Sequence, residues 1–333
     1  MRIAVLFGGE SEERDVSIAS AAQVTPALRS LGHDVVLVDA ARGVVLADRE
    51  ERILGASVSI APPTELELVT IRGTSRIMDL SASLVDFDVV FMALHGGRGE
   101  NGRVQSLLEI AGIPYTGSGP LGSALAMDKD ISKRLFRVAG IPTPHWIMGS
   151  PDAETVETHL GIPVIVKPAS QGSTVGLTLV RNSADLAAAY AVAGQYGEVI
   201  VERYIAGREI TVGVLDGGAL AVGEILLGGD EPFSYEDKYL PGTVHEVFPA
   251  DLPSEVAEEA RRIAVAAHRT LKLDSYSRSD FRLDDSGQLW LIEVNTLPGM
   301  TATSLLPQSA AAVGVDFPAL CQRICELALR GHR

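Results

Sequence analysis

The sequence is poor in cysteine. Only Cys321 and Cys325 occur among 333 residues, four positions apart near the C-terminus. This spacing places both on one face of an expected helix. Because no other metal ligand is close in the sequence, we interpret them as buried packing residues rather than a metal pair. A reducing compartment fits such a low cysteine content.

Long hydrophobic runs and positive charge are also scarce. No apolar stretch approaches the roughly 18 residues that a transmembrane helix needs. The apolar segment at residues 2–7 is too short for a signal peptide and turns into a Gly-Gly loop. The formal net charge of −15 argues against nucleic acid or an anionic membrane as the main partner. We therefore expect a soluble cytoplasmic protein without nucleic-acid or membrane partners.

Lysine is the rarer of the two basic residues, since arginine supplies most of the 28 positive charges. A compact ammonium is not interchangeable with a guanidinium, so each remaining lysine is a candidate for a specific role. The lysines are Lys129, Lys133, Lys167, Lys238 and Lys272.

The first 120 residues alternate between apolar strands and helical segments, which is typical of a parallel, doubly wound sheet. Strands are expected at 2–7, 33–39 and 88–94, and helices at 16–31 and 104–110. The length suits two or three domains.

After about residue 127 the pattern changes to a short α+β block and then to antiparallel hairpins. The block has expected helices at 130–139 and 184–192 and expected strands at 164–167 and 198–204. Hairpins are expected around 216–218 and 284–287, with an amphipathic helix at 254–271 for which Ser254 is a good N-cap. We predict a mixed α/β and α+β fold with domains at 1–125, 126–210 and 211–333.

Two common nucleotide-binding motifs are absent or weak. The chain has no Gly-Lys dipeptide, which excludes a Walker A loop. Gly117, Gly119 and Gly122 form a G-x-G-x-x-G, but no acidic residue follows at the distance that dinucleotide binding requires. We interpret this loop as a packing or substrate-approach element.

A third candidate is "VIVKPASQGSTVG", residues 164–176. Lys167 ends an apolar strand, where a lysine is costly unless it meets an anion. The following loop offers backbone N–H groups and the hydroxyls of Ser170, Ser173 and Thr174, and such a loop can wrap phosphate oxygens. Taken alone, an edge-strand lysine before an ordinary loop explains the segment equally well.

Oxygen ligands follow this segment. Glu202 and Glu209 bracket the exit of a strand, where an adenine can use backbone groups and a ribose can use a carboxylate. Asp280, Glu293 and Asn295 fall on adjacent arms of one expected hairpin, and the last two share a strand face. Three oxygen ligands, together with phosphates and water, suit Mg²⁺. We therefore predict a nucleotide-bound Mg²⁺ (or Mn²⁺) over this hairpin.

Seven segments spread over nearly the whole chain form a specific set: "LFGGESEERDVS", "ALHGGRGENGRVQSLLEIAGIPYTGSG", "ALAMDKDISK", "VKPASQGSTVG", "EDKYLPG", "SRSDF" and "EVNTLPGMTATSLLP". Together they resemble the ATP-grasp superfamily and, within it, the D-alanine–D-alanine ligase family. The resemblance implies an ATP-grasp fold preceded by an N-terminal Rossmann-like domain with a parallel sheet. It also implies a ligase that uses ATP.

The resemblance implies how ATP and the metal are bound. The two phosphate-binding lysines match Lys129 and Lys167, and Ser173 in the loop after Lys167 is a further cofactor-binding residue. Glu202 matches the carboxylate near the adenine amino group, and Glu209 matches the one that binds the ribose. The implied Mg²⁺ ligands are Asp280, Glu293 and Asn295.

The resemblance also implies the sites for the two amino acids. Glu13 would receive the ammonium of the first D-alanine, with His95 nearby. Ser173 and Tyr239 would fasten a closing loop together with Glu13, and Lys238 lies beside Tyr239. The implied oxyanion stabilisers for the reacting carbonyl are Arg278 and the Gly299 N–H. The implied hydroxyl that binds the carboxylate of the second D-alanine is that of Ser304.

Several of these residues have a simpler interpretation. His95 could cap a loop, Tyr239 could be an ordinary loop aromatic, and Ser304 could be a helix N-cap. Two positions depart from the family pattern: Asn101 stands where the family generally has Asp, and Ser234 stands where an acidic residue is common.

The implied reaction joins two D-alanines through a D-alanyl phosphate, for peptidoglycan precursor synthesis. The polar stretch at 229–242, with Gly and Pro, suits a lid that excludes water. A ligase that uses D-lactate, D-serine or another amino acid as second substrate is an alternative, although the pair Lys238-Tyr239 favours an amine. A nucleotide-binding protein without turnover is a further alternative. We also expect a homodimer.

Overall fold

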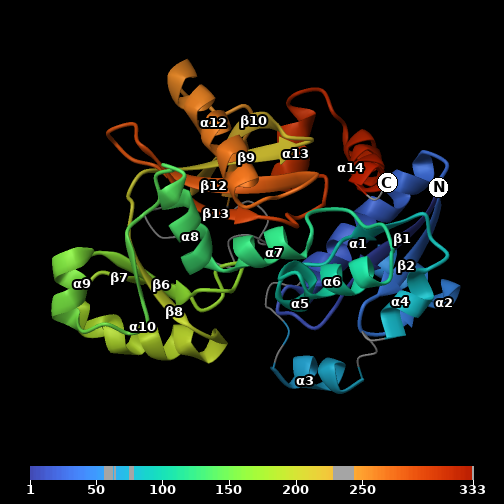
Figure 1. The fold of residues 1–333 in the computed structure, drawn as a ribbon, viewed down its shortest axis with the longest axis horizontal. Coiled ribbons are helices and arrows are strands. Elements are labelled where there is room, and N and C mark those ends of the chain that lie inside the picture. Colours follow the sequence, from blue (N-terminus) through green and yellow to red (C-terminus); the bar gives the residue numbers. More distant parts are fainter. Residues whose placement is uncertain (56–62, 64, 75–78, 228–243, 332–333) are drawn as a thin grey trace.

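A computed structural model describes residues 1–331, except 56–62, 64, 75–78 and 228–243. Three sheets follow one another along the chain, and each is covered by helices (Figure 1). In this view the first sheet lies on the right, the second in sequence on the left, and the third in the upper centre.

The first sheet is formed by β1 (Arg2–Phe7), β2 (Asp34–Asp39), β3 (Gly43–Val44) and β4 (Val89–Met92). β1 pairs in parallel with both β2 and β4, which confirms the predicted parallel sheet. β3 is a short edge strand that pairs antiparallel with β2, so the sheet is not wholly parallel. The sequence did not predict β3, because two residues are too few to show a periodicity.

Six helices accompany this sheet in the described part of residues 1–110. They are α1 (Arg14–Ser30), α2 (Ala47–Leu54), α3 (Glu65–Thr74), α4 (Leu80–Leu84), α5 (Gly97–Glu100) and α6 (Arg103–Ile110).

The second sheet has the order β5-β8-β6-β7 and is antiparallel. Its strands are β5 (Trp146–Met148), β6 (Val164–Pro168), β7 (Thr178–Val180) and β8 (Val199–Arg203). The helices before and around it are α7 (Pro120–Met127), α8 (Lys129–Val138), α9 (Ala153–His159) and α10 (Leu186–Ala193), with 3₁₀ turns at Ser183–Asp185 and Gly194–Tyr196.

The third sheet is antiparallel with the order β11-β10-β9-β12-β13. Its strands are β9 (Arg208–Leu215), β10 (Gly218–Leu227), β11 (Val244–Val247), β12 (Tyr276–Leu283) and β13 (Leu289–Asn295). Both predicted hairpins are present. At the turn between β9 and β10, Asp216 and Gly217 have φ of 52° and 74°, the left-handed conformation that tight hairpin turns require.

Three helices complete the chain: α12 (Ser254–Thr270), α13 (Leu305–Ala311) and α14 (Phe317–Gly331). The prediction of Ser254 as an N-cap was wrong by one residue. Ser254 is already helical and Pro253 occupies the cap position, where its side chain makes no capping hydrogen bond. Proline fixes its own φ, which suits the turn into the helix but leaves the first amides without a side-chain acceptor.

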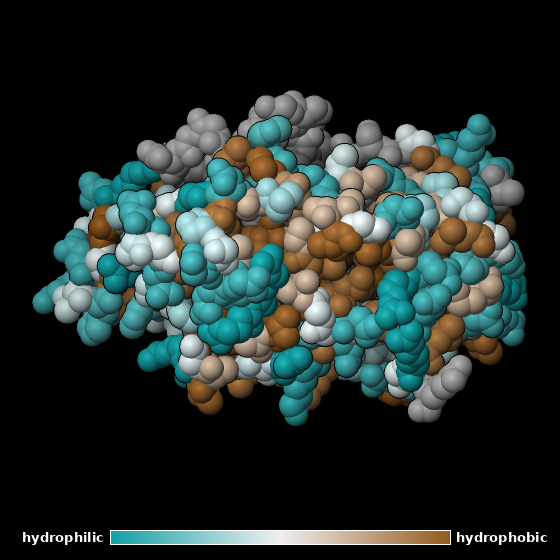
Figure 2. Space-filling view, turned by 90° about the horizontal axis from the view of Figure 1, so that it is seen from above, coloured by the Kyte–Doolittle hydropathy of each residue, from teal (hydrophilic) through white to brown (hydrophobic). Residues whose placement is uncertain are grey.

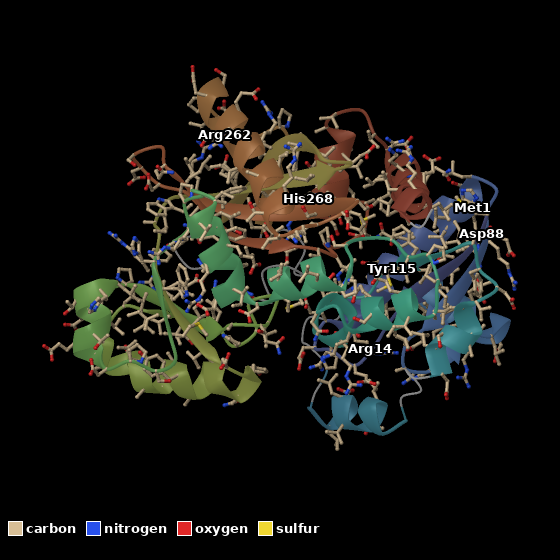
Figure 3. The ribbon with its side chains drawn as sticks, viewed as in Figure 1. Met1, Arg14, Asp88, Tyr115, Arg262 and His268 are labelled. Atoms are coloured by element: carbon tan, nitrogen blue, oxygen red, sulfur yellow. The ribbon has the colours of Figure 1, made fainter. Side chains whose placement is uncertain are left out.

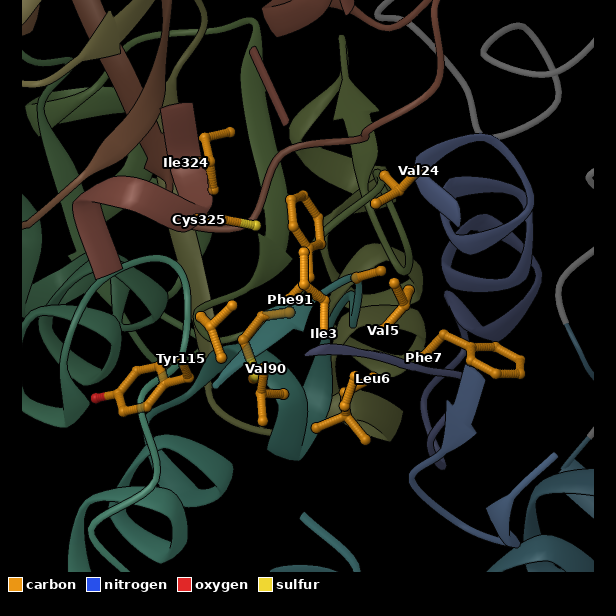
Figure 4. Packing of buried hydrophobic residues seen from close by; sticks show 14 of the residues in the cluster. Ile3, Val5, Leu6, Phe7, Val24, Val90, Phe91, Tyr115, Ile324 and Cys325 are labelled. Carbon is orange, nitrogen blue, oxygen red and sulfur yellow. The ribbon is translucent and has the colours of Figure 1, made fainter. Parts of the chain in front are cut away.

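The C-terminal helix returns to the first sheet. Leu320, Cys321, Ile324 and Cys325 belong to the same buried cluster as the strands β1 and β4. Figure 4 shows Ile324 and Cys325 facing the same packed interior as Phe91. Both thiols are free and buried, which confirms the prediction of packing cysteines.

The surface agrees with a folded chain whose apolar residues are mostly enclosed. Seen from above, hydrophilic residues cover most of the two ends of the molecule, while hydrophobic residues gather near the middle of this face (Figure 2). In the described ranges, no helix is both long enough and apolar enough to cross a bilayer.

Candidate active site

The loops that follow β1 and β4 leave the parallel sheet at its carboxyl edge. In the sheet, β1 has β2 on one side and β4, the later strand, on the other, so the strand order reverses at β1. Ligands of such sheets bind beyond the carboxyl ends of the strands at this reversal. Arg14, labelled in Figure 3, fixes the first loop. Its guanidinium donates to the Gly9 carbonyl oxygen at 2.7 Å and pairs with the buried Asp39.

Glu13 lies between two loops that come from different sheets. The Ser173 hydroxyl donates to Glu13 Oε1. A Cβ atom at Gly96 would lie 2.5 Å from Glu13 Oε2, and one at Gly172 would lie 2.9 Å from the same oxygen. Glycine at both positions therefore allows the two loops to close on the carboxylate.

The glycine-rich loop that follows β6 carries unusual backbone conformations. Ser173 and Thr174 have φ of 48° and 58°, in the left-handed region that non-glycine residues seldom adopt. Such a conformation costs on the order of 1–3 kcal/mol per residue and is found mostly where the surrounding structure enforces it, as at ligand-binding sites. The conformation aims the Ser173 hydroxyl at Glu13.

Helix α8 presents two lysines to the site. Asp128 caps the helix by accepting the Ile131 N–H at 3.0 Å, so Lys129 is the first helical residue and Lys133 follows one turn later on the same face. Lys129 Nζ donates to the Gln171 carbonyl oxygen at 2.6 Å and lies 3.2 Å from Glu293 Oε2. This ammonium thus joins the glycine-rich loop to the end of β13.

Lys167 meets an anion of the protein itself. Its Nζ lies 2.8 Å from Glu202 Oε2, and both residues are buried. The structure therefore resolves why a lysine can end this apolar strand: it pairs with Glu202 on the neighbouring strand β8, and the pair lies beside the glycine-rich loop.

Lys133 was not among the predicted site residues, although it was one of the five lysines. Its ammonium is fully buried, lies 3.2 Å from Glu202 Oε1 and donates to Thr143 Oγ1 at 2.8 Å. Burial lowers the Lys133 pKa to about 8, although the Glu202 carboxylate opposes this shift. Glu202 is thus held between two cations, Lys133 and Lys167.

The three predicted metal ligands come together at the paired ends of β12 and β13. Asp280 is the cross-strand partner of Glu293, and Asn295 Nδ2 donates to Asp280 Oδ2 at 2.8 Å. Arg278 forms a two-pronged hydrogen bond with Asp280, through Nε at 2.9 Å and Nη2 at 2.7 Å. The cations that hold the two carboxylates are therefore Arg278 and Lys129.

This donor set fits a magnesium ion that completes its shell with substrate oxygens. The predicted donors are oxygens of two carboxylates and one amide, the kind of ligand that Mg²⁺ prefers. Within the part of the chain that the structure describes, no three His, Cys, Asp or Glu side chains gather into a metal-binding group. The protein alone thus offers a partial shell, as expected where nucleotide phosphates supply the remaining ligands.

Glu209 and Ser304 are two further predicted site residues whose contacts the structure describes. Glu209 Oε2 lies 3.4 Å from Arg282 Nη1, on the neighbouring strand β12. Ser304 holds the N-cap position of α13 but makes no capping hydrogen bond. Its hydroxyl lies instead against Thr301, and a Cβ atom at Gly299 would come within 2.8 Å of it. The Ser304 hydroxyl therefore lies directly beside the Gly299 backbone.

His95 and Glu100 connect the first sheet to the loop that carries Gly299. His95 Nδ1 lies 2.8 Å from the Leu297 carbonyl oxygen, and burial lowers the His95 pKa to about 4. Glu100 was not predicted. It accepts the N–H groups of Gly96 at 3.1 Å and Leu297 at 3.3 Å, while burial, reinforced by Glu13, raises the Glu100 pKa to about 7. The only sequence feature that could have pointed to Glu100 is its position in the segment "HGGRGENG", residues 95–102.

Some predicted residues lie outside the described ranges: Ser234, Lys238 and Tyr239, together with the expected lid at 229–242. Asn101 is described, and its Oδ1 accepts the Arg103 N–H at 3.3 Å at the start of α6. The amide thus keeps the acceptor role that an aspartate would fill at this helix start.

The antiparallel second and third sheets, with the glycine-rich loop after β6 and the oxygen-rich hairpin of β12 and β13, define an ATP-grasp fold. The parallel sheet before them is the Rossmann-like domain that the sequence predicted. Two family models match the chain, the D-Ala–D-Ala ligase N-terminus over residues 2–118 and the D-Ala–D-Ala ligase C-terminus over residues 135–326. The chain belongs to the D-alanine–D-alanine ligase family.

Individual relatives agree over the full length. The chain is 42% identical to a D-alanine–D-alanine ligase of Gloeobacter violaceus, covering 99% of this chain and 100% of that one. It is 43% identical to the ligase of Nitratidesulfovibrio vulgaris, covering 99% and 98%. Among solved structures, the ATP complex of the Bacillus anthracis ligase superposes with a TM-score of 0.79 at 33% identity, covering 100% of this chain and 98% of that one. The Coxiella burnetii ligase gives 0.79 at 28% identity, covering 100% and 94%.

Proposed function

We propose that this protein joins two molecules of D-alanine to D-alanyl-D-alanine at the expense of ATP, for the synthesis of peptidoglycan precursors. The observation that carries the proposal is the glycine-rich loop. Gln171 accepts from Lys129, which pairs with Glu293, and two residues later Ser173 binds Glu13. One loop thus connects the groups suited to a nucleotide and metal with the carboxylate suited to a substrate ammonium.

In the first step, Glu13 pairs with the ammonium of the first D-alanine and orients its carboxylate toward ATP. A carboxylate oxygen forms a bond to the γ-phosphorus, and the bond to the bridging oxygen of ADP breaks. Lys129 and Lys167 hold the phosphate oxygens while charge spreads over them, which is the main protein contribution to phosphoryl transfer. The products of this step are ADP and D-alanyl phosphate.

In the second step, the amine of the second D-alanine, having lost a proton to solvent, attacks the acyl carbon. The tetrahedral intermediate places its oxyanion near the Arg278 guanidinium and the Gly299 N–H, which stabilise the developing charge. The nitrogen then loses a second proton to solvent, the carbon–oxygen bond to phosphate breaks, and inorganic phosphate leaves with the bonding electrons. Ser304 binds the carboxylate of the second D-alanine.

Asp280, Glu293 and Asn295 would hold Mg²⁺ or Mn²⁺. Bound there, the ion neutralises phosphate charge as a Lewis acid. Arg278 and Lys129, which pair with these carboxylates in the structure, would then turn toward the substrate oxygens.

Further parts of the proposal concern the lid and the assembly. Tyr239 would join Ser173 and Glu13 in closing the lid over the acyl phosphate, with Lys238 beside it. Glu202 and Glu209 would bind the adenine and the ribose. We propose a homodimer that acts in the cytoplasm, built from domains at 1–125, 126–210 and 211–333.

A product assay tests the function. The protein is incubated with ATP, Mg²⁺ and D-alanine, alone or with an equal amount of D-lactate, D-serine or L-alanine, and products are identified by mass spectrometry. We expect D-alanyl-D-alanine, with one ADP and one phosphate for each dipeptide. Abundant D-alanyl-D-lactate or D-alanyl-D-serine would assign a different second substrate, and ATP binding without ADP formation would indicate a binding protein.

A further inference from the structure

Four side chains near the first sheet hold the backbone of the loop that contains Gly299. Glu100 accepts the Leu297 N–H at 3.3 Å, and His95 Nδ1 lies 2.8 Å from the Leu297 carbonyl oxygen. Ser20 accepts the Met300 N–H at 3.2 Å, and Gln23 accepts the Ala302 N–H at 2.6 Å. Each contact joins parts of the chain about 200 or more residues apart in sequence, so the loop depends on a distant part of the chain for its position.

Ser20 and His95 form a closed network with this loop. A carbonyl oxygen only accepts, so His95 Nδ1 carries the proton that is donated to Leu297. His95 Nε2 is then an acceptor in the neutral ring, and it lies 3.0 Å from Ser20 Oγ. The Ser20 hydroxyl therefore donates to His95 and accepts the Met300 N–H at 3.2 Å.

The network encloses Gly299. It fixes one backbone group two residues before this glycine and another one residue after it. Ser20 and His95 are both buried, and every donor and acceptor in the network has one partner of the opposite kind. Buried networks that are fully satisfied in this way hold a single geometry, because any displacement leaves a buried polar group unpaired.

We propose that Ser20 and His95 are positioning residues that aim the Gly299 N–H at the oxyanion of the second step. The inference rests on the proposed function, since it concerns the amide assigned to that intermediate. His95 then acts on the reaction through the loop and does not bind the ammonium of the first D-alanine, because both of its ring nitrogens are used by the protein.

Ser20→Ala tests the proposal, because it removes the acceptor for Met300 and the donor for His95 together. We expect the rate of dipeptide formation to fall by roughly tenfold, a part of the 10²–10³ that complete loss of an oxyanion donor costs. ATP affinity stays unchanged, and more than one phosphate is released per dipeptide because the acyl phosphate meets water before the amine. Ser20→Thr restores the hydroxyl and should recover most of the rate.

Ser17 provides a matched control on the same helix. Its buried hydroxyl also bridges two backbone groups, accepting the Gly8 N–H at 2.7 Å and donating to the Ala93 carbonyl oxygen at 2.6 Å, but it does not touch the Gly299 loop. Ser17→Ala should lower thermal stability about as much as Ser20→Ala. It should keep the wild-type ratio of phosphate to dipeptide.

Amide hydrogen exchange gives a result that does not depend on catalysis. Peptides that cover residues 296–302 should exchange faster in Ser20→Ala than in wild type, and at the wild-type rate in Ser17→Ala. Unchanged exchange, or a wild-type phosphate-to-dipeptide ratio in Ser20→Ala, would overturn the proposal, as would equal uncoupling in both variants. If wild type forms no dipeptide at all, the proposed function fails, and the exchange result still decides whether the network holds the loop.

Discussion

Lys133→Met should change how stability depends on pH. The Lys133 ammonium is fully buried between Glu202 and Thr143, and burial lowers its pKa from 10.5 to about 8. This shift corresponds to about 3 kcal/mol. Between pH 8 and 10.5 the unfolded chain binds a proton that the folded chain has released. Wild-type stability therefore gains this amount as the pH rises from 8 to 10.5, and has lost it again once the pH has fallen back to about 8.

The measurement is urea unfolding of wild type and Lys133→Met at several pH values from 7 to 10.5. Trp146 is a suitable fluorescence probe, since Lys133 Nζ lies 5.7 Å from its ring centroid. The free energy of unfolding of wild type minus that of the variant should rise by about 3 kcal/mol across the window, because other groups contribute to both proteins. Lys272→Met makes the same substitution at an exposed position, so it measures how much the loss of any lysine changes the free energy of unfolding. A difference that stays constant or falls would refute the reasoning.

Three further predictions concern the reaction. Asp280→Asn and Glu293→Gln keep the side-chain shape but remove a charged metal ligand, so turnover should fall roughly 100-fold or more with an unchanged circular dichroism spectrum; wild-type turnover in both would contradict the metal assignment. Ser173→Ala removes a hydrogen bond to Glu13 worth about 0.5–1.5 kcal/mol, so the phosphate released per dipeptide should exceed one; a variant that stays fully coupled would rule out this role. Dipeptide formation should rise from about pH 6 to about pH 9, because the second amine must lose its proton before it attacks; a rate that is flat over this range would count against an amine acceptor.

The sequence was most informative where contacts are local. The hairpin of β12 and β13 follows from alternating apolar residues and a turn of only a few residues, and it brings Asp280 and Glu293 into register. Lys167 near the end of β6 was recognised as a candidate site residue from its own strand alone, because an ammonium in an apolar strand needs an anion. The sequence analysis expected ATP phosphate as that anion and a place near the adenine for Glu202, so neither the pair of Lys167 with Glu202 nor the second cation, Lys133, was predicted.

Residues that act across long sequence separations could not be read from any window of the sequence. Glu100 and Ser20 bond to backbone groups 197 and 280 residues away. Serine on a helix and glutamate in a glycine-rich loop are ordinary features in themselves. Their role depends on which loop packs against them, and that is decided by the arrangement of the sheets. The same reason explains why the contacts of the His95 ring with Ser20 and the Leu297 carbonyl oxygen were not predicted.

Transfer of oxygen from substrate to phosphate is the most direct test of the proposed reaction. D-alanine labelled with ¹⁸O in its carboxyl group is incubated with ATP, Mg²⁺ and the protein, and the inorganic phosphate is analysed by mass spectrometry. If the carboxylate attacks the γ-phosphorus and phosphate later leaves the acyl carbon, each phosphate carries one oxygen from D-alanine, in equal amount to the dipeptide. Dipeptide formed together with unlabelled phosphate would contradict the acyl phosphate route.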